Sequence, residues 1–181
     1  MAKAVPIYKL TQTKSLLRDN ALVLMVRVQE LMDFADSMRS PENVTDLHNL
    51  RIAAKRLRYT LELFAPVLEP EGVARLMSRV TEIQERIGAI HDCDVLFPLI
   101  QDTLETEGER EKRAKKKRGG PIVGPPPFLA AEGLIALLAR KRDERVRLYS
   151  DFLAFWDALP PERLASDLSL LIVPAEDSSP S

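Results

Sequence analysis

Cysteine, histidine and long apolar runs are all scarce in this 181-residue chain. The single cysteine, Cys93, excludes an internal disulfide and favours a reducing compartment. No stretch approaches the ~18 uncharged apolar residues that a membrane-spanning helix needs. The first residues also lack the apolar core of a signal peptide. These absences predict a cytoplasmic protein without a membrane span.

An excess of charge of one sign is also missing. The chain has 26 Lys and Arg against 27 Asp and Glu, for a formal net charge of -1. The overall charge therefore gives no attraction to nucleic acid, and any affinity for an anion must come from local clusters of cations. The length and the hydrophobic fraction of 45% suit one globular domain with a single core.

Apolar residues recur three and four positions apart over most of the sequence, and no alternating β pattern competes with them. This periodicity predicts an all-α fold, an antiparallel bundle of about four long helices. We expect helices over 13–38, 46–65, from 70 onward, over 128–159, and a short one over 162–171. The predicted organisation is an N-terminal extension (1–12), a bundle (13–159) containing a basic Gly/Pro-rich linker (108–127), and a short helix with a disordered tail (160–181).

A row of basic residues is the most informative feature of the chain. His48, Arg51, Lys55 and Arg58 share one stripe of the predicted second helix, because positions three and four apart lie on one face. The row runs beside the apolar seam and spans roughly 15 Å, at about 1.5 Å per residue. Like charges at these spacings repel one another, so the row gains from a bound anion. We interpret it as a track for a polyanion.

Further cations lie near the apolar seams of the other helices. A cation removed from water needs either a carboxylate or a bound anion as its partner. The sequence is compatible with both kinds of partner. Glu62, Glu82 and Glu85 are candidate carboxylates. The cations concerned are Lys14, Arg75, Arg79, Arg86, Lys141 and Arg145.

Two segments together resemble a known family. The helix His48-Asn49-Leu50-Arg51-Ile52-Ala53-Ala54-Lys55-Arg56-Leu57-Arg58-Tyr59 is similar to the signature helix of the CHAD family, the conserved-histidine α-helical domains. The segments Leu63-Phe64-Ala65-Pro66 and Ile87-Gly88-Ala89-Ile90-His91-Asp92-Cys93-Asp94-Val95-Leu96 look like its later motifs. The resemblance implies an all-α domain that binds inorganic polyphosphate through inward-facing His, Arg and Lys, without catalysis, cofactor or metal. By position it adds Arg56 to the four basic residues of the row.

The chain is shorter than the usual members of this family. CHAD proteins usually contain two related four-helix units that face each other across a basic cavity, whereas the basic motif occurs once here. A homodimer that completes the cavity is the favoured arrangement, with an open surface or a different partner chain as alternatives. Association with polyphosphate granules would follow from this function.

Other functions compete with polyphosphate binding. His48, the pair His91-Asp92 and a later aspartate such as Asp143 or Asp151 echo the order of ligands in helical metal phosphohydrolases, although the chain has only two histidines. A protein-interaction scaffold is a second alternative. Nucleic-acid binding by the charged run 110–118 is disfavoured, because no aromatic residues for stacking surround it.

Overall fold

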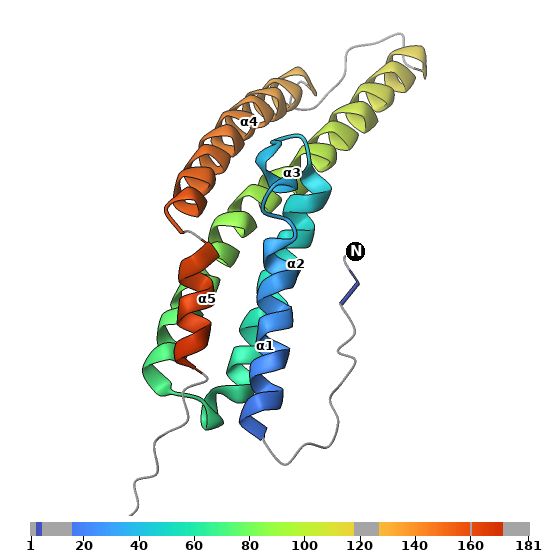
Figure 1. The fold of residues 1–181 in the computed structure, drawn as a ribbon. Helices are drawn as coiled ribbons and strands as arrows, with labels where there is room; N and C mark the ends of the chain where they lie inside the picture. Colours follow the sequence, from blue (N-terminus) through green and yellow to red (C-terminus); the bar gives the residue numbers. More distant parts are fainter. Residues whose placement is uncertain (1–2, 5–15, 118–126, 160, 172–181) are drawn as a thin grey trace, which may run out of the picture. The chain divides into compact units, whose positions relative to one another are not determined.

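A computed structural model shows a chain built from helices joined by turns (Figure 1). It describes residues 3–4, 16–117, 127–159 and 161–171, and every regular element among them is helical. The elements are α1 (Leu16–Met32), the 3-10 helix η1 (Ser37–Arg39), α2 (Val44–Phe64), the 3-10 helix η2 (Ala65–Val67), α3 (Pro70–Lys117), α4 (Pro127–Asp157) and α5 (Pro161–Leu170). The predicted all-α fold is therefore confirmed.

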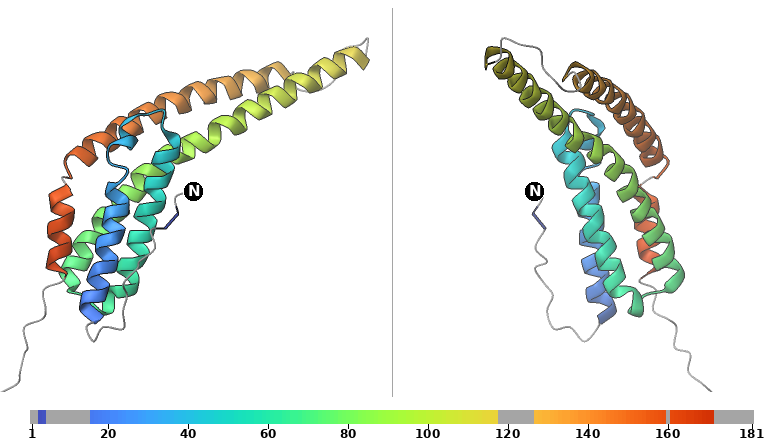
Figure 2. Two further views of the ribbon diagram at one scale, coloured as in Figure 1. Left: turned by 45° about the vertical axis from the view of Figure 1, so that its right-hand side comes forward. Right: turned by 180° about the vertical axis from the view of Figure 1, so that it is seen from behind.

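The chain divides into two compact units, and both α3 and α4 contribute to each. The first unit comprises Met1–Gly88 and Asp151–Ser181, and the second comprises Ala89–Ser150. In the first unit, α1, α2, the beginning of α3 and α5 run alongside one another in the views of Figure 2. Helix α1 contacts both α2 and α5, so these helices enclose one core.

Leucine and isoleucine at helical spacing form the core of the first unit. On α2, Leu47, Leu50, Ala54, Leu57 and Leu61 of the predicted apolar seam are buried, as expected, whereas Phe64 at the end of the seam is half-buried. Buried residues of the other helices also contribute to this core. They are Leu24 and Leu31 of α1, Leu76, Val80, Ile83 and Ile87 of α3, Phe152 and Trp156 of α4, and Leu164 and Leu168 of α5. A three-four apolar repeat on each helix thus produces one continuous hydrophobic interior.

The second unit is a pair of antiparallel helices, the later part of α3 and the earlier part of α4. Its described buried side chains include Ile90, Cys93, Ile100 and Tyr149. Arg145 of α4 donates hydrogen bonds to the carboxylate of Asp94 on α3, which joins the two helices.

Two helix ends differ from the sequence prediction. Helix α1 ends at Met32, six residues before the predicted end, and the buried Met38 belongs to η1. Helix α2 is capped by Asn43, whose side chain accepts a hydrogen bond from the backbone N–H of Asp46, 3.3 Å away. The helix therefore begins at Val44, two residues before the predicted start, and Asp46 lies in its first turn, where it accepts a bond from the Asn43 amide.

The predicted linker at 108–127 is wrong in its first half, because α3 continues to Lys117. Glu, Lys and Arg favour helix, and ion pairs one turn apart link Arg110 to Glu107 and Arg113 to Glu109. Residues 118–126 lie outside the described part of the chain. Helix α3 also passes through Pro98 without ending.

Candidate anion-binding site

Helix α2 presents its basic row on the flank of its buried face. Each residue advances the helix by about 100°, which places His48, Arg51, Lys55 and Arg58 roughly a third of a turn from the axis of the buried leucines. His48, Arg51 and Arg58 are half-buried, and Lys55 is exposed. The core fixes the rotation of α2, and so it also fixes where the row meets solvent.

Tyr59 lies between two cations at the end of the row. The Nζ atom of Lys55 is 5.6 Å from the centre of the Tyr59 ring, and the Cζ atom of Arg58 is 5.3 Å from it. Both distances suit cation–π attraction, which draws the two side chains toward the ring. Nε of Arg58 also lies 3.2 Å from Oε1 of Glu62, one turn further along. Glu62 therefore neutralises the last cation of the row.

Arg56 lies on the opposite flank of α2 from the other four basic residues. With Asn49 of the same helix it lines a cavity of about 260 Å³, whose other charged lining residues are Glu30 of α1, Asp33 just after α1, and Lys3. The family motif groups Arg56 with the row by sequence position, but the helical period separates them. Arg56 therefore lies on a different flank of α2 from the row, and an anion on the row does not meet it.

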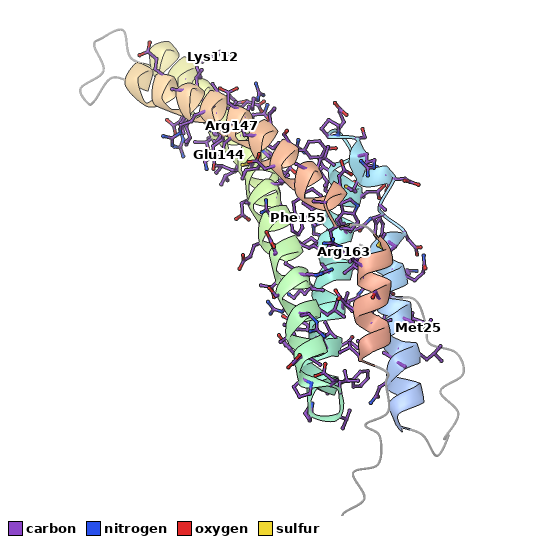
Figure 3. All side chains as sticks on the ribbon, turned by 60° about the vertical axis from the view of Figure 1, so that its left-hand side comes forward. Met25, Lys112, Glu144, Arg147, Phe155 and Arg163 are labelled. Atoms are coloured by element: carbon purple, nitrogen blue, oxygen red, sulfur yellow. The ribbon has the colours of Figure 1, made fainter. Side chains whose placement is uncertain are left out.

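The three arginines predicted near the seam of α3 all have carboxylate partners within the first unit. Nη1 of Arg75 lies 3.6 Å from Glu71, and Nη1 of Arg79 lies 2.9 Å from Asp167 of α5. Nη2 of Arg86 lies 2.7 Å from Glu82, and its guanidinium covers the ring of Phe155, labelled in Figure 3, at 4.5 Å. The pair of Arg79 with Asp167 joins α3 to α5, and the contact of Arg86 with Phe155 joins α3 to the end of α4.

The two cations that interrupt the seam of α4 are also paired with carboxylates. Nε of Arg145 lies 2.5 Å from Oδ1 of Asp94, and the two side chains are only 12% and 9% exposed. Nζ of Lys141 lies 2.7 Å from Glu144, and this bond lowers the pKa of the Glu144 carboxyl. For α4 the internal carboxylate, rather than a ligand, offsets the cost of burying the charge. Lys14 lies outside the described residues.

The residues that suggested a metal centre do not converge in the described part of the chain. Among residues 3–4, 16–117, 127–159 and 161–171, no group of three or more His, Cys, Asp and Glu side chains is placed to hold a metal ion. Nδ1 of His91 lies 3.8 Å from the carboxylate of Asp92. Burial raises the pKa of the Cys93 thiol, and the nearby Glu144 carboxylate raises it further, which suits an inert thiol.

With this geometry established, the chain was compared with known proteins. The sequence model of the CHAD domain matches residues 8–101, more than half of the chain. The chain belongs to the CHAD family. In this CHAD domain, the match covers α2 with its basic row, and it covers α3 as far as Gln101. No curated protein and no solved structure is significantly similar to the chain. None of its described helices is long and apolar enough to span a bilayer.

Sequence reasoning missed several partners of the cations. Asp94 pairs with Arg145, which is 51 positions away, and Asp167 pairs with Arg79, which is 88 positions away. Helical periodicity carries no information about contacts at such separations. The pairs within one helix, such as Glu82 with Arg86, were detectable from their spacing of four. The role of Tyr59 was also detectable, because Lys55 lies one turn before it.

Proposed function

We propose that this CHAD domain binds inorganic polyphosphate along the basic row of α2, as a binding module rather than an enzyme. The observation that carries the proposal is the contrast between cations. Arg79, Arg86, Lys141 and Arg145 are bound to carboxylates. In the described part of the chain, no ion pair joins Arg51 or Lys55 to a carboxylate. Among the described candidate cations compared in this way, Arg51 and Lys55 of α2 are therefore the ones available to a ligand.

The side chains of the row supply complementary contacts to a phosphate chain. The planar guanidinium of Arg51 can donate paired hydrogen bonds to two phosphate oxygens, and the Lys55 ammonium adds a mobile point charge. Arg58 joins them when the anion displaces Glu62. The imidazole of His48 adds a third kind of hydrogen-bonding contact to the phosphate oxygens.

A second copy of the chain is the partner that we propose for completing the site. A single row contacts a polymer from one side only and leaves its other side to water. Two rows related by a twofold axis would enclose the polymer with identical groups. A domain with this activity would belong with cytoplasmic polyphosphate granules. Nucleic acid, with bulkier repeats, is the disfavoured polyanion.

Calorimetric titration tests this proposal. Long-chain polyphosphate is titrated into the full chain at two salt concentrations, with single-stranded DNA of matched charge as competitor. We expect salt-sensitive binding that DNA competes for poorly. Replacing His48, Arg51, Lys55 and Arg58 together by Ala should abolish it.

The matched control replaces Arg110, Lys112 and Arg113, three exposed cations of α3, by Ala. It removes the same formal charge at neutral pH and should leave the affinity unchanged. Unaltered binding by the α2 variant, or equal loss in the control, would refute the assignment to α2.

A further inference from the structure

Tyr59 is an aromatic residue of α2 that the core of the first unit does not use. It is 49% exposed, whereas Leu57 and Leu61, two positions before and after it, are fully buried. Two residues advance an α-helix by about 200°, so Tyr59 leaves α2 on the side opposite the core. A large aromatic side chain stabilises a fold mainly through burial, and this one keeps about half of its surface in water. The hydrophobic core therefore does not account for a tyrosine at this position.

The ring of Tyr59 lies among the cations of the basic row. The Nζ atom of Lys55 is 5.6 Å from the ring centre, and the Cζ atom of Arg58 is 5.3 Å from it. Lys55 precedes Tyr59 by four positions, the spacing at which side chains on one face of a helix meet. Both distances lie within the range of about 6 Å over which a ring attracts a cation. One ring thus attracts two like charges that otherwise repel one another.

Contact with a ring differs from contact with a carboxylate in its effect on a ligand. A carboxylate offsets the charge of its cation and occupies its N–H donors, as Glu82 does for Arg86. A neutral ring attracts the cation and leaves its net charge in place. Glu62 approaches Arg58 at 3.2 Å, but these side chains are 51% and 33% exposed, so water and salt screen the pair and an anion can displace it. The Tyr59 ring therefore holds cations without neutralising them.

Holding the cations in advance lowers the cost of binding an anion. Lys and Arg side chains have much rotamer freedom, and they lose it when they become fixed against a ligand. Lys55 is exposed, so the core does not restrain its long stem. Attraction to the Tyr59 ring restricts the ammonium before the anion arrives, and less freedom is then lost on binding.

We propose that Tyr59 is a positioning residue of the anion site, and that its ring holds the Lys55 ammonium and the Arg58 guanidinium together for a phosphate chain. Tyr59 acts through these two cations and needs no contact of its own with the anion. The inference rests on the proposed binding of polyphosphate along α2, and it adds a neutral residue to the cations of that site. It does not depend on a second copy of the chain.

Two substitutions of Tyr59 in the full chain test the role of the ring. Tyr59→Phe keeps the aromatic face, and Tyr59→Leu keeps apolar bulk without it. In calorimetric titrations of long-chain polyphosphate, we expect Tyr59→Phe to bind within about twofold of the wild type. We expect Tyr59→Leu to bind about fivefold more weakly, because two exposed cation–π contacts are lost. Both variants should keep the helical circular dichroism of the wild type, since the position is half exposed.

The matched control changes another exposed residue on the same side of α2. Leu63 lies one turn after Tyr59 and is 72% exposed. Leu63→Ala removes apolar surface near the row without touching the ring, and it should leave the affinity for polyphosphate unchanged. An equal loss in Leu63→Ala and Tyr59→Leu would overturn the inference, because it would assign the effect to apolar surface rather than to the ring.

Substitution of Lys55 separates positioning from direct contact between the ring and the anion. A ring that acts through the cations has less to act on in a chain that carries Lys55→Met. The loss caused by Tyr59→Leu should therefore shrink from about fivefold to about twofold in that background. An undiminished fivefold loss would overturn the inference, because the effect would then not pass through Lys55.

Nuclear magnetic resonance of the ligand-free chain gives a readout that needs no polyphosphate. Protons held near the face of an aromatic ring are shifted by its ring current. We expect shifted side-chain resonances of Lys55 in the wild type and in Tyr59→Phe, and ordinary positions in Tyr59→Leu. Identical resonances in the three chains would overturn the inference. Wild-type binding that Tyr59→Leu leaves unchanged would overturn this inference alone, whereas absence of binding by the wild type would refute the proposed function as well.

Discussion

The cations of this CHAD domain differ in their partners. Arg79 is 27% exposed and pairs with Asp167, which is 11% exposed, whereas Arg51 lies on the basic row without a carboxylate partner among the described residues. A cation that neutralises a nearly buried carboxylate stabilises the fold. One that repels its neighbours on the same stripe is available to a ligand.

Replacing each of these two arginines by Ala should therefore give opposite results. Arg79→Ala leaves the Asp167 carboxylate without its counter-charge, and we expect a loss of about 1–3 kcal/mol in the free energy of unfolding with unchanged polyphosphate affinity. Arg51→Ala should change stability by less than about 0.5 kcal/mol and weaken binding severalfold. Urea denaturation and calorimetry on the two variants measure both quantities. A weaker affinity in Arg79→Ala at unchanged stability would contradict this division.

Glu69 makes stability depend on pH at the start of α3. Its carboxylate accepts hydrogen bonds from the backbone N–H groups of Glu71 and Gly72, and these bonds lower the pKa of Glu69. A carboxyl with a lowered pKa in the folded state stabilises the protein above the pKa of the unfolded chain and loses this contribution as pH falls. The cap is thus fully effective at neutral pH and fails in acid.

Glu69→Gln isolates the charge of this cap. Its melting temperature should fall below that of the wild type at pH 7, and the difference should shrink as pH falls below the ordinary pKa range of a glutamate and vanish only below the lowered pKa of Glu69. Thermal unfolding followed by circular dichroism from pH 3 to pH 7 provides the measurement. A difference independent of pH would show that the ionised carboxylate does not stabilise α3.

At the scale of the helices, two glycines of α3 have opposite surroundings. A Cβ atom at Gly72 would lie 2.7 Å from Cδ2 of Leu171 and 2.9 Å from Oε2 of Glu69, so a side chain there displaces the capping carboxylate. A Cβ atom at Gly88 meets nothing within 4 Å. Helix propensity favours Ala over Gly at both positions, and only the first has a steric cost.

We therefore expect Gly88→Ala to raise the free energy of unfolding by about 0.5–1 kcal/mol and Gly72→Ala to lower it by about 1 kcal/mol. Chemical denaturation of the two variants beside the wild type checks the signs. Stabilisation by both substitutions would mean that Leu171 and Glu69 move aside at no cost.

The helices were predictable from the sequence to the extent that apolar periodicity determines them. The buried seam of α2 and the all-α fold follow from the three-four repeat, and both are confirmed. The end of α1 was not predictable, because Met38 continues the apolar pattern through a turn into η1. The extension of α3 to Lys117 was missed because a run of Glu, Lys and Arg fits both a solvated helix and a linker.

Helical spacing also made it possible to predict which residues form the basic row. His48, Arg51, Lys55 and Arg58 share a flank by spacing alone, and the structure places them so. Arg56 was assigned to them through the family motif, and its place opposite Glu30 and Asp33 follows from rotation about the helix axis. Pairing across helices, such as Arg145 with Asp94, requires the tertiary structure.

For the molecule as a whole, the near-neutral net charge makes salt dependence a direct test of where a polyanion binds. A chain of formal charge -1 has no overall field that attracts polyphosphate, so the salt sensitivity of binding counts the local cation–phosphate contacts. By analogy with nucleic acids, each contact contributes about one to the slope of log affinity against log salt concentration. We expect Arg51→Gln to reduce this slope by about one and Arg110→Gln to leave it unchanged, in calorimetric titrations of polyphosphate over a range of NaCl concentrations. Both variants change the net charge equally, so equal slopes would assign the affinity to the total charge of the molecule, and different slopes assign it to the row on α2.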